Sequence, residues 1–195
     1  LGAYSAQCTS GNDNVILGTQ SGKHATTGCY NVFFGKSAAA GGPSNNGSTG
    51  NHNIVMGCEA GLCLTSGTDN IFLGQEAGKK IVDGVDNVAL GQHAGCALTS
   101  SDGNVFLGSN AGCNANPSSA GVFIGKDAGA GAVSSNTGPG NIFIGERAGY
   151  KNCAGQSNVF IGKDAGCTNC GGNANIFLGK DSGAGPTSNS HCFNI

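Results

Sequence analysis

The sequence predicts an all-β fold, a parallel β-solenoid or β-roll of about ten 17-residue repeats with two short strands per repeat. Three observations predict it. A motif of Asn, an apolar triplet and Gly recurs along the whole chain of 195 residues. Glycine accounts for 37 of these residues, and the triplets are rich in the β-branched and aromatic side chains that favour strands. We therefore interpret residues 1–195 as a single repeat array.

The spacing of the repeats is read from the glycine that closes each triplet. Seven of the ten intervals between successive glycines equal 17 residues, which suits a flattened coil of two strands and two tight turns. Two longer intervals hold insertions at about 39–49 and 131–139, whose small and polar residues predict surface loops. The closing glycines are Gly2, Gly18, Gly35, Gly57, Gly74, Gly91, Gly108, Gly125, Gly145, Gly162 and Gly179. They predict turns with positive φ or a close approach of two backbones.

The residue before the triplet is Asn in nine of ten repeats, and Gly121 is the exception. Stacked coils would place these side chains one above another, which predicts an amide ladder. The ladder residues are Asn14, Asn31, Asn53, Asn70, Asn87, Asn104, Asn141, Asn158 and Asn175. Because the feature belongs to the repeat, we interpret it as structural and not as catalytic.

Both faces of each triplet are apolar. Side chains alternate along a strand, so the first and third positions point one way and the middle position points the other way. The middle position is Phe in seven of ten repeats: Phe33, Phe72, Phe106, Phe123, Phe143, Phe160 and Phe177. A thin coil has one interior, so the other face must be covered by a second layer of the chain or by another copy. No second layer is evident, which favours self-association, with the Phe column in the core or at the interface.

The segment Asn87-Val88-Ala89-Leu90-Gly91-Gln92-His93-Ala94 resembles the head-domain repeat N-x-V-A-I-G-x-x-A of trimeric autotransporter adhesins. Similar repeats occur in phage and viral tail fibres. The resemblance implies a parallel β-roll that serves as a surface fibre, stalk or adhesive head, and a trimer with a shared core. The period of 17 residues, the frequent Phe and the ten cysteines depart from the family pattern.

The ten cysteines predict an oxidising location, extracellular or on the surface of a virion or cell. Cys96 and Cys113 lie five residues after their closing glycines, and Cys153 and Cys170 lie eight residues after theirs. Stacked coils place such Cα atoms ~4.8 Å apart, inside the ~4.4–6.8 Å range of disulfides. We predict the disulfides Cys96–Cys113 and Cys153–Cys170. The pairing of the others stays open: Cys8, Cys29, Cys58, Cys63, Cys167 and Cys192.

Sites for metals, cofactors or catalysis are not indicated. The C-x-x-C at Cys167 and Cys170 has no second pair, and the four histidines lie at different repeat positions. Asp127, Asp164 and Asp181 share one repeat position beside lysines, which predicts a solvated charged edge. No nucleophile and base have a spacing that suits catalysis, so we predict no cofactor, no metal and no enzymatic activity.

The functional prediction is a structural subunit of an extracellular fibre or filament, self-associating through its apolar strand faces and stapled by disulfides. The alternative is an adhesive or receptor-binding head, or a tail-fibre segment, that binds a cell-surface or glycan receptor through the two insertions. Asn46 in the first insertion begins the one N-glycosylation sequon and is a candidate for modification. A net charge of −2 predicts no nucleic-acid partner, and no apolar run is long enough to predict a membrane span. An ice-binding solenoid would need a Thr column, and a hexapeptide-repeat enzyme would need 18-residue coils.

The two ends suggest head-to-tail stacking. Leu1-Gly2 resembles the end of a triplet motif and Asn194-Ile195 resembles its start, so the two ends set together nearly rebuild one motif. No signal peptide is visible at Leu1, which predicts a mature or truncated product. An open head-to-tail contact would build a filament, with Cys8 and Cys192 as candidates for an inter-subunit disulfide. The alternative is that the ends have no structural meaning.

Overall fold

In the part of the chain that the structure describes, ten short strands form one sheet, and each strand is one apolar triplet of the sequence. The computed structural model describes residues 2–6, 9–42, 48–114, 119–131, 138–152, 154–169 and 171–184. The strands are β1 (Val15–Leu17), β2 (Val32–Phe34), β3 (Ile54–Met56), β4 (Ile71–Leu73), β5 (Val88–Leu90), β6 (Val105–Leu107), β7 (Val122–Ile124), β8 (Ile142–Ile144), β9 (Val159–Ile161) and β10 (Ile176–Leu178).

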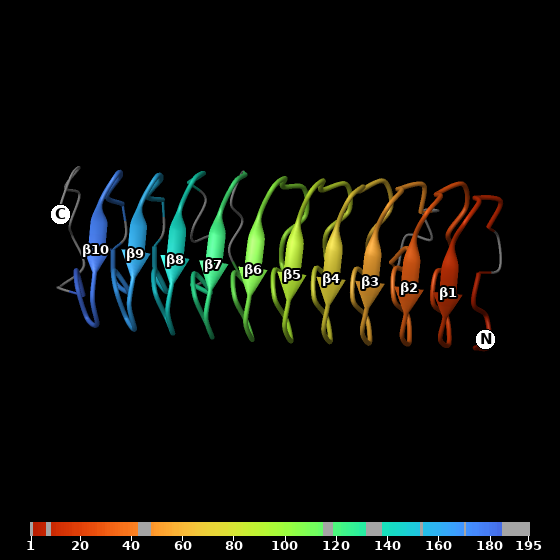
Figure 1. Ribbon diagram of the computed structural model, residues 1–195, viewed down its shortest axis with the longest axis horizontal. Coiled ribbons are helices and arrows are strands. Elements are labelled where there is room, and N and C mark those ends of the chain that lie inside the picture. Colours follow the sequence, from red (N-terminus) through yellow and green to blue (C-terminus); the bar gives the residue numbers. More distant parts are fainter. Residues whose placement is uncertain are drawn as a thin grey trace.

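All neighbouring strands are parallel and follow the order of the sequence from β1 to β10. The register places like positions side by side, so that Val88 pairs with Val105 and Leu90 with Leu107. Each turn of the solenoid therefore adds one strand beside the previous one, and β1 and β10 lie at opposite ends of the long axis (Figure 1). The predicted all-β parallel solenoid is confirmed. Within the described ranges, no helix is long and apolar enough to cross a membrane.

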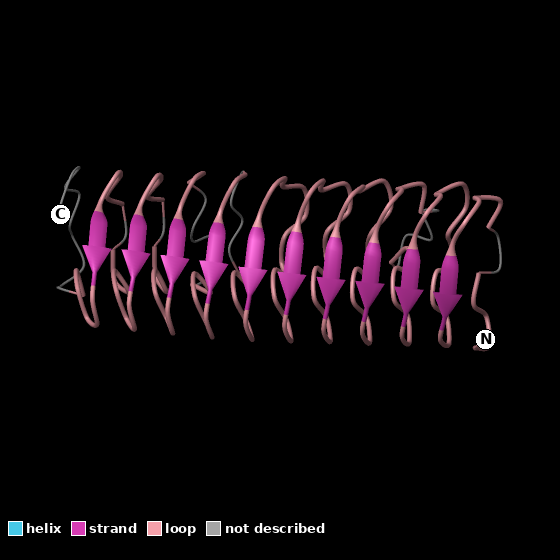
Figure 2. Ribbon diagram, in the orientation of Figure 1, coloured by secondary structure: helices cyan, strands magenta, loops and turns pink. Residues whose placement is uncertain are grey.

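The expected second strand of each repeat is not found among the described residues. Turns occupy the rest of each coil (Figure 2), apart from isolated bridges that join Ala25 to Ser48 and Asp102 to Ser119. These turns still bond to the next coil: the Gly95 amide, for example, donates to the Ala111 carbonyl at 2.9 Å. Left-handed residues, such as His93 with φ 56°, interrupt the extended backbone that a strand needs. Hydrogen bonds between neighbouring coils therefore satisfy the backbone groups of these turns, although the turns do not have strand geometry.

The interior is a narrow core with the Phe column at its centre. Six of the seven phenylalanines of the column are at most 1% exposed, and Phe177 is 7% exposed. From Phe106 to Phe177 consecutive rings lie 4.8–5.4 Å apart between centroids. An alanine three residues after most closing glycines, such as Ala94, is also fully buried and leaves room for the rings. The Phe column therefore belongs to the core of a single chain, and the aliphatic positions face outward.

The closing glycines have both properties that the sequence suggested. Gly91 has a φ of 135°, a region that L side chains rarely adopt. A Cβ atom built there would lie 2.6 Å from the carbonyl oxygen of Gly108 in the next coil. The same contact recurs from coil to coil, so the glycine column sets how closely the coils stack.

Candidate functional site

The outer sheet face consists of the first and third residues of each strand, which point away from the Phe core. The first row contains Val15, Val32, Ile54, Ile71, Val88, Val105, Val122, Ile142, Val159 and Ile176. The second row contains Leu17, Phe34, Met56, Leu73, Leu90, Leu107, Ile124, Ile144, Ile161 and Leu178. Every side chain in both rows is apolar, and the parallel register stacks them into two straight lines.

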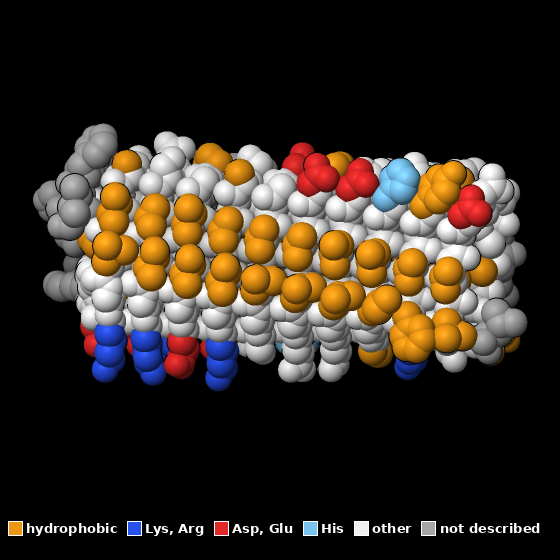
Figure 3. All heavy atoms as spheres, viewed as in Figure 1, with side chains coloured by type: hydrophobic (Ala, Val, Ile, Leu, Met, Phe, Trp, Pro, Cys, Tyr) orange, Lys and Arg blue, Asp and Glu red, His pale blue; other side chains and the backbone are white. Residues whose placement is uncertain are grey.

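The outer sheet face is open to solvent in the part of the chain that the structure describes. Figure 3 shows the two rows crossing the whole molecule as nearly continuous hydrophobic bands. The central members are half-buried because their stacked neighbours cover their flanks, and none of the twenty is fully buried. At the ends exposure rises, to 61% for Val15 and 62% for Leu178. Of the alternatives that the sequence left open, a second covering layer is therefore absent from the described residues.

The size of the outer sheet face follows from strand geometry. Three residues span about 10 Å, and ten strands spaced ~4.8 Å apart span about 48 Å, which gives a flat area of about 480 Å². Monomeric proteins carry largest apolar patches of roughly 300–600 Å², and these are often functional. The outer sheet face is thus a candidate interaction surface that runs the full length of the solenoid.

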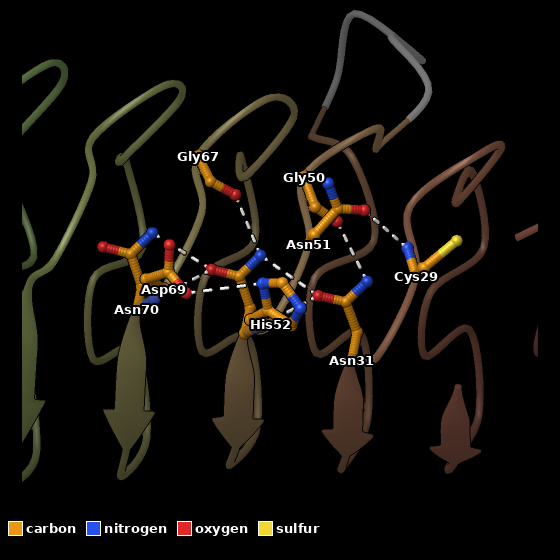
Figure 4. Close-up of polar contacts among 9 residues, drawn as sticks. Cys29, Asn31, Gly50, Asn51, His52, Gly67, Asp69 and Asn70 are labelled. Atoms are coloured by element: carbon orange, nitrogen blue, oxygen red, sulfur yellow. Dashed lines mark hydrogen bonds and ion pairs between the residues drawn. The ribbon is translucent and has the colours of Figure 1, made fainter. Parts of the chain in front are cut away.

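The asparagine ladder lies buried beside the strands. Figure 4 shows part of it: Asn31 donates from Nδ2 to the Gly50 carbonyl at 2.9 Å, and Asn70 lies in the same line. The Asn70 side chain donates to Asn53 Oδ1 at 3.0 Å and to the Gly84 carbonyl at 2.7 Å. Its own Oδ1 accepts from the backbone amide and Nδ2 of Asn87 at 3.0 and 3.1 Å. Asn31, Asn53, Asn70 and Asn87 are each held by an asparagine on either side, which supports a structural role.

The ladder has one interruption, at the repeat where Gly121 replaces asparagine. The backbone amide of Gly121 still donates to Asn104 Oδ1 at 2.8 Å, but Gly121 has no side chain that could accept from or donate to Asn141. Asn141 instead donates from Nδ2 to the carbonyls of Gly138 and Gly155. Beyond this point the ladder resumes, and Asn158 donates to Asn141 Oδ1 at 3.1 Å. The nine residues therefore form two runs, Asn14 to Asn104 and Asn141 to Asn175.

Replacing Asn70 by aspartate is expected to lower the free energy of unfolding at pH 7 by about 2–5 kcal/mol. The new carboxylate oxygen would face the Asn53 and Gly84 oxygens, with no proton to donate. Burial and these oxygens would raise the carboxyl pKa of the folded state above ~3.9. The penalty is then largest above that folded pKa and shrinks as the pH falls through it, since a protonated carboxyl can donate again. Denaturant unfolding across pH measures the effect.

Asn51→Asp is the matched control, because Asn51 Oδ1 only accepts, from the Cys29 amide at 2.7 Å. An aspartate keeps that acceptor in a half-buried position, so a change below about 1 kcal/mol is expected. Equal penalties at positions 51 and 70 would contradict the role assigned to the ladder.

A row of charged and polar residues follows one edge of the solenoid, two residues after each closing glycine. Lys79 reaches across coils to Glu59 at 2.8 Å and to Glu76 at 3.1 Å. The hydrogen bond and charge of Lys79 lower the pKa of Glu59, and the hydrogen bond that Lys79 donates to Glu59 raises the pKa of Lys79. Arg147 lies 3.3 Å from Asp164. The predicted solvated edge is observed at Asp181, whose side chain is 58% exposed, whereas the Asp164 side chain beside Arg147 is only 13% exposed. Asp127 is half-buried and accepts a hydrogen bond from Asn110 Nδ2 at 2.9 Å. Exposed ion pairs contribute little to stability.

Cys96 and Cys113 lie on the turn side of adjacent coils, and their Sγ atoms are 2.6 Å apart. Both side chains are half-buried. The coil-to-coil register brings them together, because the Gly95 and Ala97 amides donate to Ala111 and Cys113. Their predicted proximity is thus observed, whereas the disulfide itself stays a prediction.

Several predicted features lie outside the described residues. These are the pair Cys153 and Cys170, the pair Cys8 and Cys192, the sequon at Asn46, the two ends of the chain, and the central parts of both insertions. Where the chain is described, no three His, Cys, Asp or Glu residues are grouped so as to hold a metal ion.

The sequence analysis missed the ion-pair row around Lys79 and the buried amides of Asn152 and Asn169. The sequence does contain a signal for the ion-pair row: when the repeats are aligned, Glu59, Glu76 and His93 share one repeat position. Comparison with protein-family models, with curated proteins and with solved structures finds no match for this chain.

Proposed function

We propose that the protein is a structural subunit of an extracellular fibre or filament, and that copies associate through the outer sheet face. The observation that carries this proposal is the unbroken pair of apolar rows over all ten strands. A pocket for a small ligand would be local and concave, whereas this surface is flat and repeats at every coil. The outer sheet face therefore favours a partner whose own surface repeats with the same spacing.

A second copy of this chain is the occupant that the surface favours. Two such faces share the same ~4.8 Å strand spacing, so their side chains can interdigitate along the full length at the ~10 Å distance of packed sheets. Neither row contains a charged residue, which disfavours a strongly charged partner. Parallel sheets usually have both faces covered, and the Phe core covers one face here.

The area is consistent with an assembling subunit. Stable interfaces bury about 800 Å² from each partner, and the apolar rows supply about 480 Å² of flat area. Corrugated side chains and the polar residues that flank the rows can supply the remainder as a rim. The ten cysteines support the extracellular part of the proposal, because disulfides persist in oxidising compartments.

Ile124→Lys, in the centre of the outer sheet face, is expected to weaken self-association about a hundredfold or more. An ammonium group enclosed between two apolar faces without a partner costs several kcal/mol. The free chain should tolerate it, because the side chain of Ile124 points to solvent in a single copy. Analytical ultracentrifugation over a concentration series measures the effect, and negative-stain microscopy shows whether the wild-type assemblies are filaments.

Ser109→Lys is the control, because lysine already occupies that repeat position at Lys36, Lys126, Lys163 and Lys180, and the closing glycine separates this position from the outer sheet face. It should assemble like the wild type. A wild-type chain that stays monomeric at every soluble concentration would overturn the proposal. Assemblies that survive Ile124→Lys would place the interface elsewhere, for example on the two insertions that the adhesive alternative uses.

A further inference from the structure

We propose that two copies face each other with an offset of about half a molecule, which two oppositely charged rims of the outer sheet face select, so that the assembly grows as an open filament. This inference rests on the proposed function, because the apolar rows supply the contact that the rims orient. It adds the direction in which the copies pack, their offset and the residues that determine both.

The acidic rim follows one edge of the outer sheet face, two residues before the first row. From β1 to β5 this position holds five exposed side chains, three of them aspartates: Asp13, Tyr30, His52, Asp69 and Asp86. From β6 to β10 the same position holds residues without charge: Gly103, Ala120, Gly140, Ser157 and Ala174. The negative charge of this edge is therefore confined to one half of the solenoid.

The basic rim follows the opposite edge, two residues after the second row. From β7 to β10 this position holds three lysines and one glutamate, all exposed: Lys126, Glu146, Lys163 and Lys180. From β1 to β6 only Lys36 is charged among Thr19, Lys36, Cys58, Gln75, Gln92 and Ser109. Figure 3 shows the separation, with lysines gathered below the two rows towards β10 and acidic side chains above the rows towards β1.

The placement of the two rims selects one direction of packing. Two copies that face each other can be related by a half-turn about the strand direction or about the long axis of the solenoid. The first half-turn places each rim against the same rim of the partner, so that aspartates never meet lysines. The second places the acidic rim of one copy over the basic rim of the other, and complementary charges favour that orientation. It also places the Val and Ile side chains of the first row over the second row.

The offset follows from where the charges lie along the solenoid. Without an offset, Asp69 and Asp86 would face Gln75 and Gln92 of the partner, and the lysines would face small uncharged residues. An offset of about five coils, roughly 24 Å, brings the two charged halves together. The opposed pairs are then Lys180 with Asp86, Lys163 with Asp69, Glu146 with His52 and Lys126 with Tyr30.

These pairs are within reach of one another, and the apolar rows accept the same offset. Packed sheets lie ~10 Å apart, a distance that a lysine and an aspartate side chain can span together. A lysine beside a tyrosine ring is also attractive. Phe34 is the largest side chain in either row and is 53% exposed, and this offset places it over Val122, one of the smallest.

An offset of half a molecule makes the contact open. Each copy presents its β1–β5 half to one neighbour and its β6–β10 half to another, so the whole outer sheet face is covered only when a third copy joins. A contact between two different surfaces that does not close upon itself builds a filament. Exposed ion pairs contribute little affinity one by one, so the apolar rows hold the copies together while the rims select direction and offset.

The test reverses the charge of each rim in the full chain. The acidic-rim variant carries Asp69→Lys and Asp86→Lys, and the basic-rim variant carries Lys163→Asp and Lys180→Asp. Each variant alone opposes like charges at every contact, so at low salt its assembly should be at least tenfold weaker than that of the wild type. An equimolar mixture should assemble nearly as well as the wild type, because alternating copies restore opposite charges at both contacts. Sedimentation over a concentration series measures both effects.

Three outcomes overturn the offset while leaving association through the outer sheet face intact. They are rim variants that assemble alone like the wild type, a mixture that assembles no better than either variant, and wild-type particles that stop at closed dimers. A monomeric wild type, or assemblies that survive Ile124→Lys, would instead remove the proposed function and this inference with it. Circular dichroism checks that both rim variants keep the fold, as expected for substitutions at exposed positions.

Discussion

Replacing Phe143 by alanine is expected to lower the free energy of unfolding by about 3–5 kcal/mol. The ring is fully buried, and its centroid lies 5.1 Å from that of Phe123 and 4.9 Å from that of Phe160. The cavity cannot close easily, because the bonds between coils fix the distance between neighbouring rings. Equilibrium denaturation followed by circular dichroism measures the change.

Ile144→Ala is the matched control for this substitution. Ile144 is the next residue of β8, but its side chain lies on the outer sheet face and is only half-buried. Its truncation in a dissociated chain should cost less than about 1.5 kcal/mol. Measuring both variants in the Ile124→Lys background removes any contribution from assembly. Equal losses at positions 143 and 144 would contradict the assignment of the two faces.

Gly91→Ala is expected to cost about 3 kcal/mol or more, because two independent penalties coincide at that position. The φ of 135° is unfavourable for any residue with a Cβ atom, and the added methyl would meet the Gly108 carbonyl oxygen at 2.6 Å. That oxygen is backbone, so relief requires the two coils to separate. Thermal and denaturant unfolding of the variant measure the loss.

Two other glycines separate the penalties. Gly103 has a φ of 65° but nothing within 4 Å of an added Cβ, so alanine there should cost only about 1–2 kcal/mol. Gly171 has neither feature, and its replacement by alanine should be nearly neutral. A loss at Gly171 as large as that at Gly91 would show that the close approach between coils is not the cause.

Much of the fold could be predicted from the sequence because the same short motif, a strand followed by a glycine turn, repeats ten times. The 17-residue interval set the coil length, and the apolar triplet set the strand. Asn70 and its equivalents could be placed in a ladder because a shared repeat position becomes a column once the coils stack. The same reasoning places Cys96 beside Cys113 from the sequence alone, and their sulfurs are adjacent in the structure.

Other features could not be predicted, since they depend on choices that hydrophobicity alone does not make. Phe143 and its neighbours Ile142 and Ile144 are all apolar, so alternation defined two faces without showing which one is inside. Left-handed residues such as His93 replaced the second strand with turns, and residues as different as Glu59 and Arg147 adopt the same conformation at that repeat position, so residue type does not predict it.

The in-order stacking of the strands has a kinetic consequence. Parallel sheets usually fold slowly, because their pairings join distant parts of the chain. Here the paired residues are 17 apart in seven of the nine strand pairs. Relative to 195 residues that separation is about 0.09, within the range of fast-folding helical bundles. Each new coil can dock on the one before it, so the chain can fold progressively while it emerges during synthesis.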